Sequence, residues 1–326
     1  MTTAEAPGEP TLSQATPAQV ADALAEPGIV LDLGALAVRI RSRVRALAAA
    51  LRAVYPDFPL DTTSGWCDTT VELRSAGGLR RWVRPLGTIE VDGVDPFGPF
   101  PLDQLLPHFE WGVNWASANM LNGHLLLHAG TVEVAGHGVL MVANPGSGKS
   151  TLTAALAGRG ARLLSDEFGV VRIADLALRA MLKPIALKNS SIEAIRRWSP
   201  DARFGPIYPN TRKGVLVHHA APAESVGRRR ETARPSLVIF PQWRESSPVE
   251  LDPVAQARAF MELAANSFNY EVMGPVGFDA VARLLERVRC YRLQYGRLEE
   301  AIDAIHRLCE PTQAAFESTE AAEGAA

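Results

Sequence analysis

The feature that most constrains the fold is a glycine-rich run at residues 143–151 (ANPGSGKST), which directly follows an apolar segment. Residues 139–142 are all apolar and predict a buried strand, whereas residues 149–157 predict a helix. Between them, Gly146 and Gly148 permit a backbone turn that aims successive N–H groups at one point. A strand, a glycine-rich loop and a helix in this order predict an α/β fold with an anion-binding turn.

The same run matches a P-loop in which alanine, at position 143, replaces the usual first glycine. In that motif Lys149 places a charge on the β- and γ-phosphates, and the Ser150 hydroxyl can ligate Mg²⁺. We therefore expect ATP and Mg²⁺ as cofactors. The alternative is a strand–helix turn that matches the pattern by chance. The expected nucleotide-binding residues are Gly146, Ser147, Gly148, Lys149, Ser150 and Thr151.

A second motif spans residues 162–167, in which residues 162–164 predict a strand and Asp166 and Glu167 stand at its end. A strand that ends in two acids has the Walker B pattern. We expect Asp166 to hold the magnesium ion together with Ser150, and Glu167 to act as a general base. The alternative is a pair of solvent-exposed carboxylates at the end of a strand.

Composition and periodicity divide the chain into four parts. Residues 1–15 and 311–326 are rich in small and polar residues and predict disordered tails. Residues 16–122 predict an α+β region, with helices announced by Thr16-Pro17 and Ser42 and a small antiparallel meander over residues 67–92. From residue 123 to residue 310, short apolar strands alternate with helices, which predicts that this part forms the P-loop domain.

The charge balance excludes a nucleic-acid binder that depends on bulk positive charge, because 33 Lys and Arg residues face 36 Asp and Glu residues. The three cysteines form no CxxC pair, which argues against a cysteine zinc site and favours a reducing compartment. No apolar run reaches the length of a membrane helix, and the first residues lack the pattern of a secretory signal. We expect a cytoplasmic protein without a membrane partner.

Several segments together resemble the HPr kinase/phosphorylase core, and most closely the group called HprK-related kinase A. The resemblance rests first on residues 128–130 (HAG), the apolar segment before the glycine-rich run, the run itself and residues 162–167. It extends to residues 110–115 (EWGVNW), 183–189 (KPIALKN), 210–214 (NTRKG), 235–241 and 266–270. It covers most of residues 30–308.

The resemblance implies a kinase core akin to phosphoenolpyruvate carboxykinase and phosphorylation of a serine on a small protein or peptide. It implies that Lys149 is the P-loop lysine, that His128 belongs to the site and that Glu167 accepts the proton, with Asp166 as the first acid of the pair. The family has aspartate where this chain has Glu167, which is one methylene longer. A PqqD-like peptide-binding partner and assembly into a homo-oligomer are further implications.

Three cations after the acidic pair, Lys188, Arg212 and Lys213, are candidates for stabilising the transferred phosphoryl group. The alternative for each is a surface loop charge. Two function classes stay open on the sequence alone. The first is an ATP-dependent kinase that acts on a serine-type hydroxyl. The second is a nucleotide-gated P-loop ATPase or binding switch that transfers no phosphoryl group to a partner.

Overall fold

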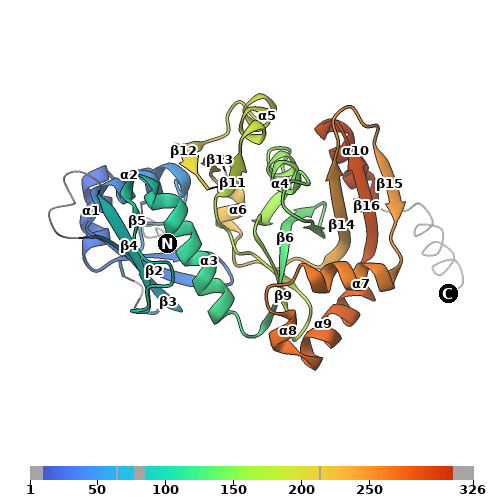
Figure 1. Cartoon of the computed structure of the whole chain (residues 1–326), viewed down its shortest axis with the longest axis horizontal. Helices are drawn as coiled ribbons and strands as arrows, with labels where there is room; N and C mark the ends of the chain where they lie inside the picture. Colours follow the sequence, from blue (N-terminus) through green and yellow to red (C-terminus); the bar gives the residue numbers. More distant parts are fainter. Residues whose placement is uncertain (1–9, 64, 77–84, 213, 311–326) are drawn as a thin grey trace, which may run out of the picture.

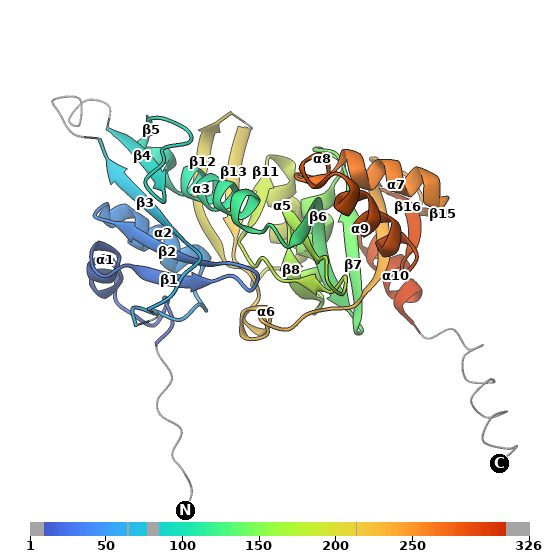
Figure 2. The same cartoon turned by 90° about the horizontal axis from the view of Figure 1, so that it is seen from below.

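The structure, a computed structural model, describes residues 10–63, 65–76, 85–212 and 214–310. It is a mixed α/β fold whose described strands form three sheets. Figure 1 shows the five-stranded sheet of the N-terminal region at one end of the long axis and the eight-stranded sheet at the other. The three-stranded sheet lies between them, as the view from below also shows (Figure 2).

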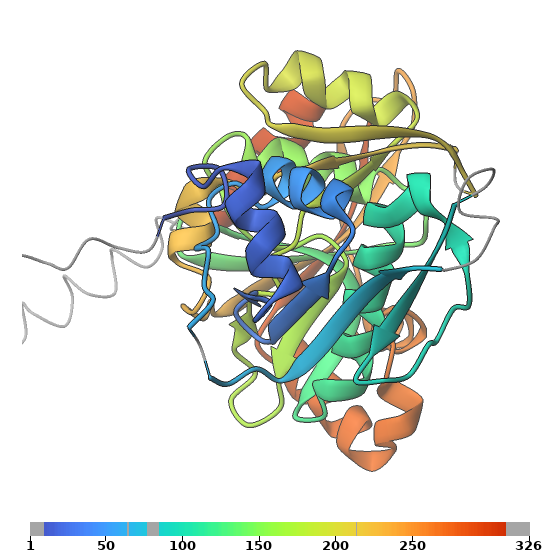
Figure 3. The ribbon, with the colours of Figure 1, turned by 90° about the vertical axis from the view of Figure 1, so that its left-hand side faces the viewer.

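The N-terminal sheet is seen from its own end of the molecule in Figure 3. Its order is β1 (Ile29–Asp32), β2 (Ala37–Ser42), β3 (Thr69–Ser75), β4 (Leu86–Val91) and β5 (Phe100–Pro101). The helices of this region are α1 (Pro17–Ala25), α2 (Arg45–Val54) and α3 (Leu105–Met120), and α3 packs on β3 and β4. The pair β3 and β4 is antiparallel, as the predicted meander requires, but β2 and β3 are parallel because α2 connects them as a crossover.

The two predicted helix starts in this region have different outcomes. Thr16 caps α1 as expected, because its hydroxyl accepts a hydrogen bond from the Gln19 amide at 3.2 Å. Ser42 instead ends β2, where its buried hydroxyl donates to the Leu73 carbonyl at 2.8 Å. The same hydroxyl accepts from the Val44 amide at 3.0 Å, and α2 begins only at Arg45.

The predicted disorder of residues 1–15 is wrong for residues 10–15. The Leu12 side chain is fully buried, and its amide donates to the Phe58 carbonyl at 2.8 Å. The Arg52 guanidinium also donates to the carbonyls of Leu12 and Ala15. One buried leucine and these backbone contacts order the segment, although its composition is that of a tail. Residues 1–9 and 311–326 lie outside the described residues.

The eight-stranded sheet carries the glycine-rich loop. Its main path runs β10 (Leu178–Arg179), β9 (Phe168–Arg172), β6 (His124–Val134), β7 (His137–Val142), β14 (Pro235–Trp243), β16 (Arg289–Tyr295) and β15 (Glu250–Pro253), and β8 (Arg162–Ser165) also pairs with β6. Three neighbours, β7, β14 and β16, are parallel, so their carboxyl ends meet at one edge. Ligands of open α/β sheets bind at such an edge.

The helices after the sheet strands cover its faces. Helix α4 (Lys149–Ala157) packs on β6 and β7 and against α10 (Leu298–Cys309). Helices α7 (Gln256–Ala265), α8 (Tyr270–Met273) and α9 (Pro275–Leu285) form a separate layer, at the bottom of Figure 1. Among the described residues, no helix combines the length and the apolar character that crossing a membrane requires.

The three-stranded sheet joins the two larger sheets. Its order is β11 (Ile185–Lys188), β13 (Gly214–His219) and β12 (Phe204–Thr211), and it is followed by the short helix α6 (Ala223–Gly227). Strand β12 contacts α2 and the 3₁₀ turn η2 (Leu102–Gln104), whereas β11 contacts α4 and α5 (Ser190–Trp198). An ion pair of 2.6 Å between Asp32 and Arg230 adds a further connection. Residues of this sheet, of α3 and of the turn after β8 line one common cavity.

Candidate functional site

The glycine-rich loop connects β7 to α4, so the predicted strand, loop and helix are all present. Gly146 and Gly148 have φ angles of +91° and +89°, in the left-handed region where a side chain is strained. A Cβ atom on Gly148 would lie 2.5 Å from the Tyr295 hydroxyl oxygen and 2.9 Å from the Trp243 Cβ. Both the backbone angle and the available space therefore require glycine at this position.

Lys149, in the first turn of α4, points toward the acidic pair. Its ammonium donates a hydrogen bond to the Asp166 carbonyl oxygen and lies 3.9 Å from Asp166 Oδ1. Burial raises the pKa of the Asp166 carboxyl, and the charge of Glu167 adds to this rise, while Lys149 and Ser150 oppose it. The structure thus brings Lys149, Ser150 and Asp166 together, as the two sequence motifs predict.

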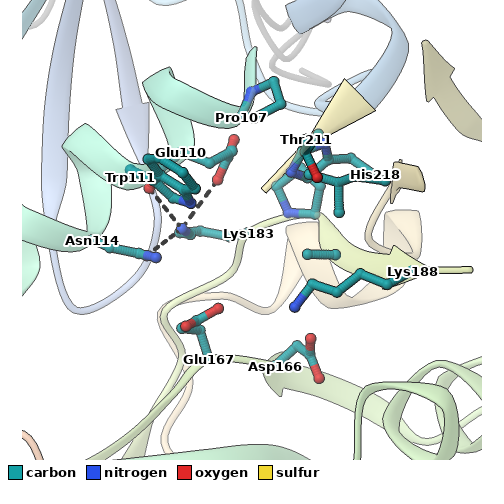
Figure 4. A pocket seen from close by; sticks show the side chains of 13 residues that line it. Pro107, Glu110, Trp111, Asn114, Asp166, Glu167, Lys183, Lys188, Thr211 and His218 are labelled. Carbon is teal, nitrogen blue, oxygen red and sulfur yellow. Dashed lines mark hydrogen bonds and ion pairs between the residues drawn. The ribbon is translucent and has the colours of Figure 1, made fainter. Parts of the chain in front are cut away.

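Asp166 and Glu167 occupy a tight turn between β8 and β9. The Ser165 hydroxyl accepts hydrogen bonds from the amides of Glu167, at 3.3 Å, and Phe168, at 3.1 Å. This serine turn bends the chain directly after the strand. Because the backbone turns here, one acid can reach Lys149 while both acids line the same cavity (Figure 4).

The acids lie in the wall of a cavity of about 190 Å³ between α3 and the three-stranded sheet, which we call the α3 cavity. Lys188, at the end of β11, extends its ammonium toward the two acids (Figure 4). The other residues that line it are Pro107, Glu110, Trp111, Asn114, Lys183, Pro184, Ala186, Thr211, Leu216 and His218.

A buried ion pair forms the opposite wall of the α3 cavity (Figure 4). Lys183 Nζ lies 3.0 Å from Glu110 Oε2, and it also donates to the Asn114 side-chain oxygen and, at 3.3 Å, to the Glu110 carbonyl. The Tyr55 hydroxyl donates to Glu110 Oε1 at 2.7 Å. Because each charged group has partners, this pair is a fixed part of the wall.

The surroundings favour an ionised Glu167. Burial alone would raise the pKa of its carboxyl, but the charges of Lys183, Lys149 and other cations outweigh burial and hold the pKa below its usual value. His218, on the far wall, is 2% exposed, and burial lowers the pKa of its imidazole to about 4. Near neutral pH the cavity therefore presents the carboxylate of Glu167 on one wall and a neutral imidazole on the far wall.

His128 lies on β6, outside the cavity lining. Its ring packs edge-on against Phe268, with 5.8 Å between ring centroids, and its amide donates to the Asn266 carbonyl at 2.7 Å. A charge on His128 contributes to lowering the pKa of Glu167, so His128 lies close enough to act on that carboxyl through space. The structure thus places His128 outside the cavity lining but within electrostatic range of Glu167.

The remaining predicted residues have different positions. Thr151 follows Ser150 in the first turn of α4, outside the cavity lining. Of the three predicted cations, Lys188 lines the α3 cavity. Arg212 is exposed in the turn between β12 and β13 and does not line it. Lys213 lies outside the described residues.

The residues at the loop suit phosphate and Mg²⁺. The Ser147 hydroxyl oxygen and Asp166 Oδ1 are buried without a hydrogen-bond partner in the described part of the chain. Buried polar atoms are ordinarily satisfied, so both atoms fit a ligand that supplies the missing partners. No group of three or more His, Cys, Asp or Glu residues suited to a metal occurs among the described residues. With Ser150 and Asp166 as its protein ligands, a magnesium ion here would take its other ligands from nucleotide and water oxygens.

Sequence reasoning assigned no role to Glu110, Asn114, Lys183 or His218. For Glu110, Asn114 and Lys183 a signal was present, because residues 110–115 and 183–189 are among the segments on which the resemblance rests. Glu110 and Asn114 are also four residues apart, which places them on one face of α3. No protein-family model matches this chain, and no curated protein is significantly similar to it.

Proposed function

We propose that the protein is an ATP-dependent, Mg²⁺-assisted kinase that transfers the γ-phosphoryl group to a hydroxyl, of the serine type, on a small protein or peptide. The observation that carries this proposal is the buried contact of Lys149 with Asp166. It joins the glycine-rich loop to a turn whose next residue, Glu167, faces a cavity. A phosphate site, a carboxylate base and space for an acceptor therefore adjoin one another.

Each group has a role in the proposed reaction. The amides of the glycine-rich loop bind the phosphates, and Lys149 neutralises their charge. Glu167 takes the proton of the acceptor hydroxyl as that oxygen forms a bond to the γ-phosphorus. The bond between the γ-phosphorus and the bridging oxygen breaks, and ADP leaves with the bonding electrons. Ser150 and Asp166 would hold Mg²⁺, which would supply further charge neutralisation.

The size of the α3 cavity favours a kinase over an ATPase. Its volume of about 190 Å³ is several times the share of about 30 Å³ that one water takes in the liquid. An ATPase needs room for a single attacking water beside Glu167, whereas a side chain with a hydroxyl needs the larger space. The resemblance to HPr kinases supports the same choice, and it suggests a peptide acceptor presented with a PqqD-like partner and a homo-oligomeric enzyme.

Transfer of label from γ-labelled ATP tests the proposal. The protein is incubated with Mg²⁺ and peptide libraries centred on Ser, Thr or Tyr, and both labelled peptide and free phosphate are measured. The proposal predicts labelled serine peptides with the wild type and far less label with Glu167→Gln. Release of free phosphate without labelled peptide would favour the ATPase or switch, and the absence of both products would contradict both functions.

A further inference from the structure

An exposed indole lies beside the glycine-rich loop, at the edge where the parallel strands end. Trp243 is the last residue of β14 and pairs with Tyr295, the last residue of β16. Tyr295 is fully buried, whereas Trp243 is 48% exposed. Since β7, β14 and β16 are parallel neighbours, Trp243 and the loop that follows β7 share one edge of the sheet.

Trp243 is fixed in place by contacts on both sides. Its amide donates to the Ser147 carbonyl of the glycine-rich loop at 2.9 Å, and its indole Nε1–H donates to the Gly296 carbonyl at 3.2 Å. Its Cβ lies close to Gly148, at a distance that leaves no room for a side chain there. Because both N–H donors are already used, the exposed ring offers an aromatic surface without a free polar group.

The strand order indicates which way a bound nucleotide would extend. The acidic pair follows β8, which pairs with β6, on one side of β7. Strands β14 and β16, with Trp243, lie on the other side. A nucleotide with its terminal phosphate near Lys149 and Asp166 therefore extends its other end away from the acids. That direction leads along the carboxyl ends of the parallel strands to Trp243.

We propose that Trp243 is the platform on which the nucleobase stacks while the glycine-rich loop holds the phosphates. This inference rests on the proposed nucleotide binding. A stacking surface recognises the face of a base and leaves its edge unread. Purine nucleotides should therefore bind more tightly than pyrimidine nucleotides, and Trp243 itself should not separate ATP from GTP.

Comparison of ATP with inorganic tripolyphosphate isolates the base contribution. Calorimetric affinities for both ligands, with Mg²⁺, are measured for the wild type, Trp243→Leu, Trp243→Phe and the control Trp66→Ala. Trp66 is 70% exposed and lies in the N-terminal region, far along the chain from the loop. Stacking of one base contributes a factor of about 10 to 100 in affinity. Leucine keeps apolar bulk against Gly148 but has no aromatic face, whereas phenylalanine keeps such a face.

We expect Trp243→Leu to weaken ATP binding by about 10-fold to 100-fold and to leave tripolyphosphate binding unchanged. Trp243→Phe should retain most of the ATP affinity, and Trp66→Ala should behave as the wild type. An unchanged ratio of ATP to tripolyphosphate affinity in Trp243→Leu would overturn the stacking role and leave the loop assignment intact. If the wild type binds neither ligand, the proposed function and this inference both fail. If Trp243→Leu also weakens tripolyphosphate binding, the result for Trp243→Phe settles the role of the ring. An equal loss of affinity in Trp243→Phe would contradict stacking.

Discussion

The ammonium of Lys149 lies 3.9 Å from Asp166 Oδ1, with both side chains more than nine-tenths buried. The two residues belong to different motifs, one at the start of α4 and the other after β8. Asp166 depends on Lys149, because burial disfavours the ionised form of its carboxyl and the charge of Lys149 opposes that effect.

The first prediction concerns Lys149→Ala. Loss of one charged hydrogen-bonding group should weaken the binding of Mg·ATP by about 10-fold to 100-fold. The fold should persist, because Asp166, with its pKa already raised by burial, can take up a proton when its partner is removed. Titration with a fluorescent ATP analogue measures the affinity, and a thermal melt checks the fold. Equal affinities for the folded variant and the wild type would contradict the phosphate role of Lys149.

The second prediction concerns Glu167→Gln. Removal of a general base typically lowers the rate of the chemical step by about 10²-fold to 10⁴-fold. Glutamine keeps the size of the side chain, so ATP affinity should stay at the wild-type value. Single-turnover transfer and nucleotide affinity, measured on the same preparation, separate the two effects. A variant that transfers phosphate at the wild-type rate would show that Glu167 is not the base.

The third prediction concerns Asp166→Asn, which should act on magnesium and not on proton transfer. The carboxylate lies next to Ser150 and Lys149, so its neutralisation should raise the Mg²⁺ concentration needed for half-maximal transfer. A magnesium titration at saturating ATP measures this shift. The two acids would have reversed roles if Asp166→Asn abolished transfer with a normal magnesium response while Glu167→Gln stayed active.

Local sequence patterns predicted the part of the site that neighbouring residues build. The strand β7, the glycine-rich loop and α4 form one continuous segment, and the acids follow it after β8. Residue types at fixed spacing were enough to predict this segment, because the geometry of the loop depends on the backbone angles of a few neighbouring residues. The chemical role of these residues stays a prediction.

Contacts between distant segments were not predictable in the same way. Glu110 lies on α3 and Lys183 lies just before β11, and the two meet only because the fold brings these distant segments together. No local pattern encodes that docking, just as the predicted meander over residues 67–92 did not reveal that β3 also pairs in parallel with β2. Leu12 illustrates a third limit, since composition predicts the average behaviour of a segment and misses a single buried anchor.

The fourth prediction concerns acid stability and does not depend on the proposed function. Burial lowers the pKa of His218 and of His219 to about 4, against 6.5 for an exposed imidazole. The unfolded chain therefore binds more protons than the folded chain between pH 6.5 and pH 4. The folded state is fully favoured above that range and loses stability as the pH falls through it.

From pH 7 to pH 5, each buried imidazole should lower the free energy of unfolding by about 2 kcal/mol. Urea unfolding at a series of pH values measures the slope. Replacement of both histidines by glutamine should flatten the dependence between pH 7 and pH 5. An equally steep slope in the folded double variant would show that other groups cause the acid sensitivity.

The last prediction concerns Lys183, whose charge helps to hold the pKa of the Glu167 carboxyl below its usual value. Lys183→Met removes that charge, so the pKa of Glu167 should rise. Since the base acts only when ionised, the acidic limb of the pH–rate profile for transfer should move to higher pH, with the rate recovering in more alkaline buffer. Lys183→Arg keeps a positive charge and should leave the limb near its wild-type position.

Lys183→Met also breaks the buried ion pair with Glu110. This should destabilise the fold by about 3–5 kcal/mol, because the charge of Glu110 stays buried without a partner. The double variant Lys183→Met/Glu110→Gln separates the two effects. Neutralising Glu110 removes the unpaired charge and should restore much of the stability, whereas Glu167 still lacks its nearby cation. The acidic limb should therefore stay displaced in the double variant. A limb that returns to the wild-type position as stability recovers would show that Lys183 acts only through the fold.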